Sequence, residues 1–425
     1  MGAGQVLKMG WILLVFCLLG CRGDSAATVV VEFWAMGREG EVAPQLLPEF
    51  ERRHPGVRVK VQQIPWGAAH EKLLTAYAGD AMPDIFQLGN TWIPEFVALR
   101  AVEPLDAWIA GSPDFDLEDY FPGILATNVI AGGLYGAPWY VDTRLLFYRR
   151  DLLARAGYDQ PPDSWDEWLT AMARLKAQAG ADRYAILLPM NEWQLPVILA
   201  LQRGAELLKD DSRYGNFRSP EFRRAFAFYL ALFRQGLAPA VGETQIANLY
   251  QEFASAYFSL YISGPWNIGE FTRRLPPAMQ DQWSTAPMPG PDARHPGVSL
   301  AGGASLAIYR GSPRKPEAWQ LLAYLSEPAQ QLAFYRLTGD LPARRTAWRE
   351  GALADMPPTR AFWTQLQALA ATPRIPEWER ITSKIAQYAE AAIRGALTVD
   401  EALAALDRDV DGILEKRRWL LGKSR

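Results

Sequence analysis

Short runs of β-branched residues alternate with longer helical patterns along the first part of the chain. Strands are expected at residues 28–34, at 57–64 with period-two alternation, and at 84–88. Between them, residues 40–56 and 68–78 carry amphipathic patterns typical of helices. Strands separated by helices predict an α/β fold with a parallel sheet and helices on both faces. In such folds, ligands bind beyond the carboxyl ends of the strands.

The rest of the chain is richer in helix. Residues 142–296 predict mostly helices with a few short strands, including helices from Ser164 to about residue 178 and over 218–236. Ser164 with Glu167 has the spacing of a capping box, and Thr398 with Glu401 repeats it before a helix over 398–414. Residues 297–341 return to a strand, over 302–309, followed by a helix over 316–335. We find no internal repeat.

The first twenty residues have the pattern of an export signal. Lys8 precedes nine consecutive apolar residues, 11–19, and Gly20 is the small residue expected before a cleavage site. Nine residues rise only about 14 Å as a helix, roughly half of a ~30 Å hydrocarbon core, so we expect this segment to be removed. Residues 18–21 resemble a bacterial lipobox, which implies a lipid on Cys21 and a tether over 21–27. An ordinary secretory signal is the alternative.

Composition narrows the classes of function. The 425 residues suffice for two or three domains, and both cysteines, Cys17 and Cys21, fall in the leader or at its junction. The formal net charge of −3 leaves no electrostatic footprint for nucleic acid. The 16 Trp, 16 Tyr and 18 Phe are a heavy aromatic load, often beside turn residues. We expect most of these rings in the core and a minority along a cleft.

Motifs for catalysis and for cofactors are weak. The three histidines, His54, His70 and His295, are far apart and lack the spacing of a metal site, so we predict no metal and no cofactor. Ser299 and Ser305 stand in near misses to a hydrolase elbow, but no histidine follows His295 to complete that order. A glycosidase needs only two carboxylates, and with 47 acidic residues it stays an open alternative.

Four segments together resemble a known family. They are Leu260 to Phe271 (LYISGPWNIGEF), Tyr140 to Leu153, Ser299 to Ile308, and Thr398 to Leu403. In this order and spacing, with the lipobox, they resemble extracellular solute-binding protein family 1, the sugar-binding components of bacterial ABC importers. The resemblance implies a type II periplasmic-binding-protein fold of two α/β lobes joined by a hinge. It places the lobes at 28–141 plus 297–345 and at 142–296 plus 346–425.

The resemblance also implies a function without catalysis. We expect a monomeric receptor, held by its lipid to a bacterial membrane and facing the periplasm or the exterior. It would capture a sugar, most simply a disaccharide such as maltose or trehalose, and deliver it to permease subunits with a separate ATPase. The alternatives are a membrane-anchored glycoside hydrolase, a binding protein of the same fold for glycerol phosphates, and an adhesin that binds a protein.

Candidate ligand contacts in the first lobe follow the strand-end rule and the family's motifs. Asp142 aligns with an acidic contact at the crossing segment, and Asn90 stands where many relatives carry an acid. Arg38 and Glu39 could instead be ordinary loop residues, and Trp66 could cover the core of the lobe. The candidates are Trp34, Arg38, Glu39, Gln63, Trp66, Asn90, Trp92, Tyr140, Asp142 and Arg144.

Later segments supply the remaining candidates. Trp266, between Gly264-Pro265 and a helix start, matches a stacking tryptophan of the family, with a core tryptophan as the alternative. Gly302 and Gly303 would let the backbone approach a ligand closely, or form a plain turn. The full set is Asn191, Trp193, Trp266, Gly302, Gly303, Arg344 or Arg345, and Trp378.

Overall fold

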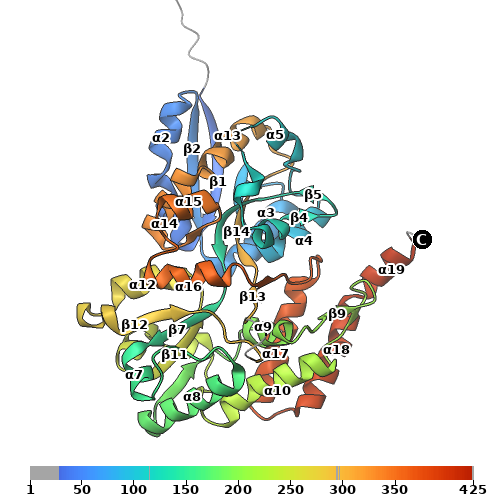
Figure 1. The fold of residues 1–425 in the computed structure, drawn as a ribbon. Coiled ribbons are helices and arrows are strands. Elements are labelled where there is room, and N and C mark those ends of the chain that lie inside the picture. The colour runs from blue at the N-terminus through green and yellow to red at the C-terminus, as the bar shows by residue number, and fades with distance from the viewer. Residues whose placement is uncertain (1–27, 114, 293–294, 296, 424–425) are drawn as a thin grey trace, which may run out of the picture.

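The two main sheets of the protein are separate, and each lies within its own lobe (Figure 1). The computed structural model describes residues 28–113, 115–292, 295 and 297–423. The expected signal peptide, Cys21 and the tether lie outside this range. Over the described part of the chain, no helix is both long and apolar enough to cross a membrane.

The first lobe is built on a six-stranded sheet in the order β15-β6-β14-β3-β1-β2. Its strands are β1 (Val29–Met36), β2 (Val57–Ile64), β3 (Ile85–Gly89), β6 (Ala137–Asp142), β14 (Gly302–Ile308) and β15 (Leu341–Pro342). The predicted strand–helix alternation is confirmed, and β1 pairs in parallel with both β2 and β3. The parallel pairing expected from these first three strands does not extend beyond β3. There β14, which returns from the other lobe, pairs antiparallel with both β3 and β6.

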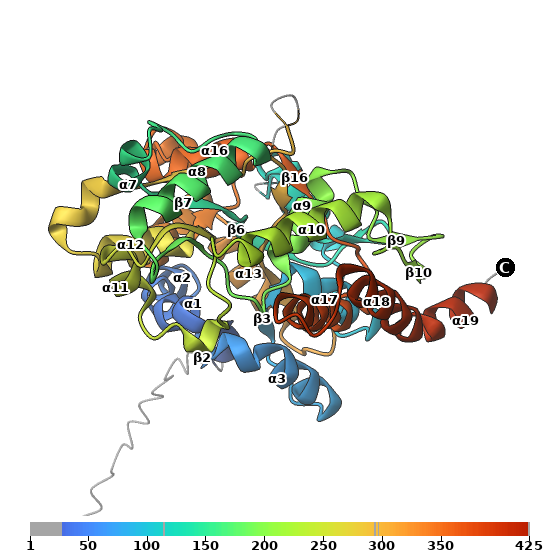
Figure 2. The same ribbon diagram turned by 90° about the horizontal axis from the view of Figure 1, so that it is seen from below.

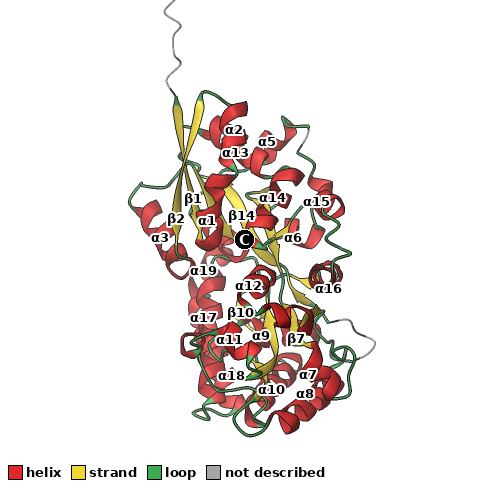
Figure 3. Ribbon diagram, turned by 90° about the vertical axis from the view of Figure 1, so that its left-hand side faces the viewer, coloured by secondary structure: helices red, strands yellow, loops and turns green. Residues whose placement is uncertain are grey.

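The second lobe holds a four-stranded sheet in the order β12-β7-β11-β8 (Figure 3). Its strands are β7 (Leu145–Arg149), β8 (Tyr184–Leu187), β11 (Phe258–Ser263) and β12 (Trp283–Ala286). Within this sheet β8 pairs in parallel with β11, whereas β7 pairs antiparallel with both β11 and β12. The fold is therefore the expected two-lobed α/β arrangement. Three short pairs complete the strands: β4 (Val129–Ile130) with β5 (Gly133–Leu134), β9 (Leu208–Lys209) with β10 (Tyr214–Gly215), and β13 (Ser299–Leu300) with β16 (Leu369–Ala370).

Helices surround the two sheets, with α12 and α16 at the junction of the lobes (Figure 1). Those on the first sheet are α1 (Gly37–Val42), α2 (Leu47–Arg53), α3 (Trp66–Ala78), α4 (Ile93–Ala98), α5 (Asp106–Ala110), α6 (Pro122–Ala126), α13 (Lys315–Leu325), α14 (Pro328–Thr338) and α15 (Arg345–Glu350). The 3-10 turns are η1 (Ala43–Gln45), η2 (Asn90–Trp92), η3 (Leu117–Asp119), η4 (Glu243–Gln245) and η5 (Pro277–Gln282).

The second lobe has the longer helices (Figure 2). They are α7 (Arg150–Arg155), α8 (Trp165–Ala179), α9 (Gln194–Gln202), α10 (Pro220–Arg234), α11 (Leu249–Ala254), α12 (Trp266–Arg274), α16 (Pro357–Gln365), α17 (Trp378–Ile393), α18 (Val399–Ile413) and α19 (Glu415–Lys423). In both views α19, at the C-terminus, projects away from the body of the molecule.

Prolines divide two of the predicted helices. The helix expected over 40–56 is split into α1, η1 and α2, with Pro44 and Pro48 in the first turns of the last two pieces. Proline lacks the backbone donor that would continue the preceding helix, and it suits the start of the next one. For the same reason, Pro328 separates α13 from α14.

The two predicted capping boxes have different outcomes. At α18, Thr398 Oγ1 accepts from the Glu401 backbone amide and Glu401 accepts from that of Thr398, so this box is confirmed. At α8, the Ser164 side chain makes no capping bond, and that prediction is wrong. The backbone amide of Trp165 instead donates to Gly290 O at 2.9 Å, so a tertiary contact satisfies one of the free donors of the helix.

Each lobe buries a large apolar core, and the chain passes between the lobes more than once. Residues 143–144 link β6 to β7, the segment after β12 leads back to β14, and the segment after α15 leads to α16. Large aromatic side chains such as Trp139, Trp168 and Trp348 are fully buried. The exact lobe boundaries stay predictions, although β6 runs through Asp142, one residue past the expected end of its segment.

Candidate functional site

A cavity of about 530 Å³ is lined by residues of both lobes. The first lobe contributes the segments at the carboxyl ends of β1, β2, β3 and β6 and the start of β14. The second lobe contributes the N-terminal ends of α9, α12 and α17. The volume falls within the range of roughly 300–1,000 Å³ found for small-molecule sites.

Most of the predicted ligand contacts lie together at this cavity. Their convergence is a matter of position, and the role of each residue stays a prediction. Those that line the cavity are Arg38, Glu39, Trp66, Asn90, Trp92, Tyr140, Asp142, Arg144, Trp193, Trp266, Gly302 and Gly303.

Three of the four tryptophans in the cavity wall lie directly against a glycine. A Cβ atom on Gly264 would overlap the ring of Trp266, and one on Gly89 would lie 3.2 Å from the Trp92 ring. A Cβ on Gly37 would lie 2.6 Å from Cδ1 of Trp66. Because these glycines have no side chain, each indole ring can lie directly against the backbone. A larger residue at any of the three positions would force the ring or the backbone to move.

Arg144 covers the ring of Trp266. Its guanidinium carbon lies 4.5 Å from the ring centroid, close enough for a cation–π interaction. Its Nη1 lies 3.6 Å from Asp142 Oδ2. Together, Asp142, Arg144 and Trp266 form a charged and aromatic cluster at the first crossing between the lobes.

Glu39 is held in place by neutral donors. Its Oε1 accepts from the Tyr140 hydroxyl at 2.7 Å, from Trp66 Nε1 at 3.1 Å and from Gln87 Nε2 at 3.3 Å. Gln87 is oriented in turn, because its Oε1 accepts from the backbone amide of Met36 at 2.7 Å. Burial raises the pKa of Glu39, and these hydrogen bonds only partly oppose that effect.

Two further carboxyl groups line the same region. Asp340 is 4% exposed, and burial together with the charges of Glu39 and Asp142 raises its pKa well above the ordinary value. Burial also raises the pKa of Asp142, an effect that the nearby Arg144 opposes. The site thus concentrates acidic groups where the charged forms are poorly solvated.

Several polar atoms of the wall have no hydrogen-bond partner among the described residues. Buried groups of this kind are normally paired, so their accumulation at one cavity indicates a surface built to bind a polar molecule. The unpartnered atoms are Asp142 Oδ1, Thr143 Oγ1, Arg144 Nη1, Gln194 Oε1 and Glu379 Oε1.

Five of the predicted contacts do not line the cavity, and Arg344 is one of them. The other four lie as follows. Trp34 faces Lys72, whose Nζ lies 4.9 Å from the ring centroid. Gln63 donates to Gly37 O at 2.8 Å, which supports the loop from behind. Asn191 lies beside Gly242. Trp378 is fully buried in the core of the second lobe and meets Trp193 edge-on, with ring centroids 5.8 Å apart.

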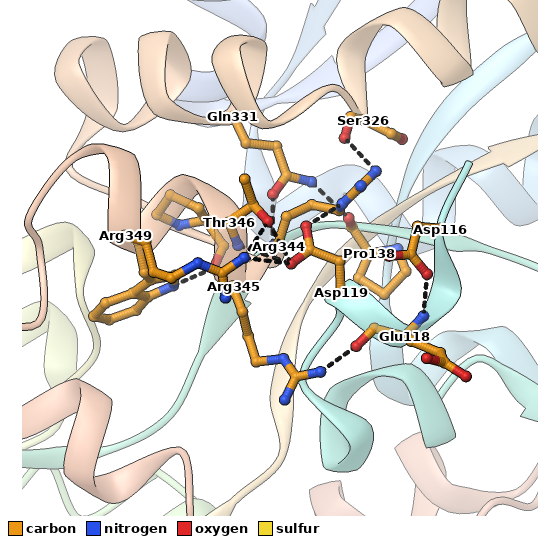
Figure 4. Close-up of polar contacts among 12 residues, drawn as sticks. Asp116, Glu118, Asp119, Pro138, Ser326, Gln331, Arg344, Arg345, Thr346 and Arg349 are labelled. Atoms are coloured by element: carbon orange, nitrogen blue, oxygen red, sulfur yellow. Dashed lines mark hydrogen bonds and ion pairs between the residues drawn. The ribbon is translucent and has the colours of Figure 1, made fainter. Parts of the chain in front are cut away.

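Arg344 is also placed elsewhere, in a buried ion pair with Asp119 (Figure 4). Its Nε donates to Asp119 Oδ2 at 2.8 Å, while Asp119 Oδ1 accepts from the backbone amide and hydroxyl of Thr346 at 2.8 Å. The neighbouring Arg345 donates to the backbone carbonyl of Glu118. Both arginines therefore attach α15 to η3 and do not reach the cavity.

Sequence reasoning missed several lining residues. Asp340 and Glu379 add two acids, and Thr91, Thr143, Gln194 and Thr372 add further polar groups to the wall. Glu379 directly follows the predicted Trp378, and a helix turns about 100° per residue, so one side chain faces the core and the next the cavity. Only the orientation of α17 distinguishes them. No three metal-ligating side chains lie together in the part of the chain described.

Comparisons with known proteins agree with the two-lobed arrangement. The profile of the bacterial extracellular solute-binding protein family matches residues 36–332. The structure of the sugar-binding protein MalE from the phytopathogen Xanthomonas citri is similar, with 49% identity and a TM-score of 0.87, over 93% of this chain and 99% of that one.

Two curated relatives are similar over most of their length. A putative binding protein of Brucella abortus is 24% identical, over 96% of this chain and 98% of its own. The diacetylchitobiose-binding protein DasA of Streptomyces coelicolor is 25% identical, over 94% of this chain and 91% of its own. With a family profile that covers more than half of its length, the chain belongs to the bacterial extracellular solute-binding protein family.

Proposed function

We propose that the protein is the substrate-binding component of an ABC carbohydrate importer, which captures a disaccharide such as maltose or trehalose in the inter-lobe cavity. The sugar is delivered unchanged to permease subunits driven by a separate ATPase. Export and a lipid on Cys21 would keep the receptor, as a monomer, beside its permease at the membrane.

The composition of the cavity wall carries this proposal. Four indole rings and several carboxyl and guanidinium groups surround one cavity. A pyranose ring has apolar C–H faces that stack on aromatic rings and a belt of hydroxyls that acids, amides and guanidinium groups bind. The sugar-binding MalE, with 49% identity, supports the same class of ligand.

The placement of the wall on both lobes supports capture by closure. Trp66, Trp92 and Glu39 belong to the first lobe, and Trp193 and Trp266 to helices of the second. A ligand that contacts both sets favours the closed arrangement, because it gains contacts there that the open one lacks. Closing two lobes around a solute requires no chemical step.

Binding and turnover can be separated in one experiment. A leaderless form with Cys21→Ser is incubated with maltose, trehalose and other sugars, while thermal melting, tryptophan fluorescence and reaction products are followed. We expect one sugar to raise the melting temperature by mass action and to be recovered intact. Cleavage of the sugar would establish the glycosidase alternative. A rise in melting temperature with glycerol phosphates alone would establish a glycerol-phosphate receptor. If no small molecule raised the melting temperature, the protein-binding alternative would be favoured.

A further inference from the structure

Acidic side chains outnumber basic ones in the wall of the cavity. Two guanidinium groups line it, from Arg38 and Arg144. Four carboxyl groups line it, from Glu39 in α1, Asp142 at the end of β6, Asp340 before β15 and Glu379 in the first turn of α17. These acids come from four distant parts of the sequence, so only the fold brings them together.

Both guanidinium groups already have an acidic partner. Arg38 Nη1 lies 2.7 Å from Glu41 Oε1, and Glu41 is outside the cavity wall. Arg144 Nη1 lies 3.6 Å from Asp142 Oδ2, and the guanidinium group also covers Trp266. The charge of each guanidinium group is therefore offset by a neighbouring carboxylate, while Arg144 Nη1 itself makes no hydrogen bond.

The three other acids have no cation at ion-pair distance among the described residues, and only the more distant charges of Arg273 and His70 act on Asp340 and Glu379. Glu39 accepts hydrogen bonds only from neutral groups, and neither it, Asp340 nor Glu379 forms an ion pair with a described cation. Asp340 and Glu39 are also buried, at 4% and 6% exposed. Water screens charges poorly at buried positions, so their effect on a ligand is larger there than at the surface.

We infer that the cavity selects its sugar by charge. It accepts a neutral saccharide, binds one that carries a protonated amine at least as well, and rejects sugar phosphates and sugar acids. This inference rests on the proposed function and narrows it. Carboxylates accept hydrogen bonds from hydroxyl groups, and a bond from an ammonium group is stronger because both partners are charged. A phosphate would face the same carboxylates with like charge.

The inference also separates this site from a glycerol-phosphate receptor. Anion sites in proteins present arginine, lysine or the backbone amides of a helix N-terminus to the phosphate. Here no lysine lines the cavity as described, and each of the two arginines has a carboxylate partner. The N-terminal ends of α9, α12 and α17 do lie at the wall, and the carboxyl group of Glu379 stands in the first turn of α17. The acids Glu39 and Asp340 occupy the buried part of the wall.

The test uses two sets of disaccharides that differ at one position. The leaderless Cys21→Ser protein is titrated by calorimetry at pH 7.5 with trehalose, its 6-phosphate and its 6-amino-6-deoxy derivative, and with the same three forms of maltose. The 6-O-acetyl ester is an uncharged control for the size of the phosphate. Asp340→Asn and Glu39→Gln test the carboxyl groups separately, and Glu206→Gln removes an exposed charge far from the cavity as a matched control.

We expect the phosphate to bind at least tenfold more weakly than the parent sugar and than the acetyl ester. The amine should bind as tightly as the parent or more tightly. Asp340→Asn or Glu39→Gln should reduce the gap between phosphate and amine, whereas Glu206→Gln should leave it unchanged. A phosphate that binds as well as the parent, or a gap that neither variant alters, overturns the inference while the sugar receptor stands. Failure of every sugar to bind overturns both.

Discussion

At the scale of single residues, the ring of Trp266 depends on the space above Gly264. Both lie in the segment SGPW, and a side chain on Gly264 would overlap the indole. The sequence alone indicated Trp266 as a contact, because a tryptophan at a helix start beside glycine and proline matches the family's motif. The sequence does not show that residue 264 must be glycine, because this follows only from where the Trp266 ring lies in the structure.

Gly264→Ala should therefore lower affinity for the cognate sugar at least tenfold while the protein stays folded, because the ring must move out of the wall. Titration followed by intrinsic fluorescence measures the change. Gly412→Ala in α18 is the matched control, since a Cβ there meets nothing within 4 Å. It should leave affinity unchanged. Equal affinity in the Gly264→Ala variant would contradict the proposed position of Trp266.

Asp340 illustrates a carboxyl group of the cavity wall whose burial costs stability. Its pKa is raised by burial and by Glu39, so the folded state holds the proton more tightly than the unfolded chain does. Stability contributed by this group is then complete below the unfolded pKa of about 3.9 and falls as pH rises through that value toward the folded pKa.

Asp340→Asn should consequently raise the melting temperature at pH 7.5, on the order of 2 °C, which corresponds to roughly 1 kcal/mol in a large domain. The gain should shrink as pH falls and should vanish near pH 3, below the unfolded pKa of about 3.9, where the carboxyl group is protonated in both states. Melting curves across this pH range provide the check. A variant that is less stable at pH 7.5 would show that the carboxylate stabilises the fold.

At the scale of elements, the sequence predicts strands well and interrupted helices poorly. The strand predicted over 57–64 from its alternating pattern is observed as β2, with the same bounds. Its two end residues, Val57 and Ile64, are buried in the lobe. The helices expected over 40–56 and 316–335 are each divided at a proline. Whether a chain continues in the same direction after a proline depends on tertiary packing, which periodicity does not record.

The attachment of α15 to η3 shows the same limit. Arg344 was expected at the ligand, yet it pairs with Asp119 across 225 residues of sequence. Burial opposes ionisation of Asp119, but the hydrogen bonds from Arg344 and Thr346 outweigh it and lower the pKa. No sequence pattern connects these two positions.

Asp119→Asn should destabilise the protein by about 3 kcal/mol at neutral pH, because it leaves Arg344 buried without its partner. The lowered pKa means that this stability is present above the unfolded pKa and is lost as pH falls through the folded one, so the difference should shrink in acid. Urea unfolding at pH 7 and pH 3 measures this difference in the free energy of unfolding.

The control is Asp400→Asn. Its ion pair with Arg223 is exposed, so the substitution should change the free energy of unfolding very little. Equal effects of the two variants would contradict the structural role.

At the scale of the whole molecule, the two lobes and their order along the chain could be anticipated from four short motifs in sequence. The composition of the cavity could be anticipated only in part. Residues beside recognised motifs, such as Asn90 and Trp92, lie on the wall as expected. Asp340 and Glu379 belong to no motif. They reach the cavity because the fold places the start of β15, in the first lobe, and the first turn of α17, in the second, at the same wall.

The central claim is that a saccharide binds between the lobes, against indole faces and polar groups, without being altered. The most direct measurement is a calorimetric titration of the leaderless protein and of a Trp266→Ala, Asp142→Ala variant with maltose and trehalose. We predict that one sugar binds the parent protein and is recovered unchanged, and that its affinity falls at least a hundredfold in the variant. Equal affinity in both proteins, or no binding of either sugar to the parent, would contradict the account.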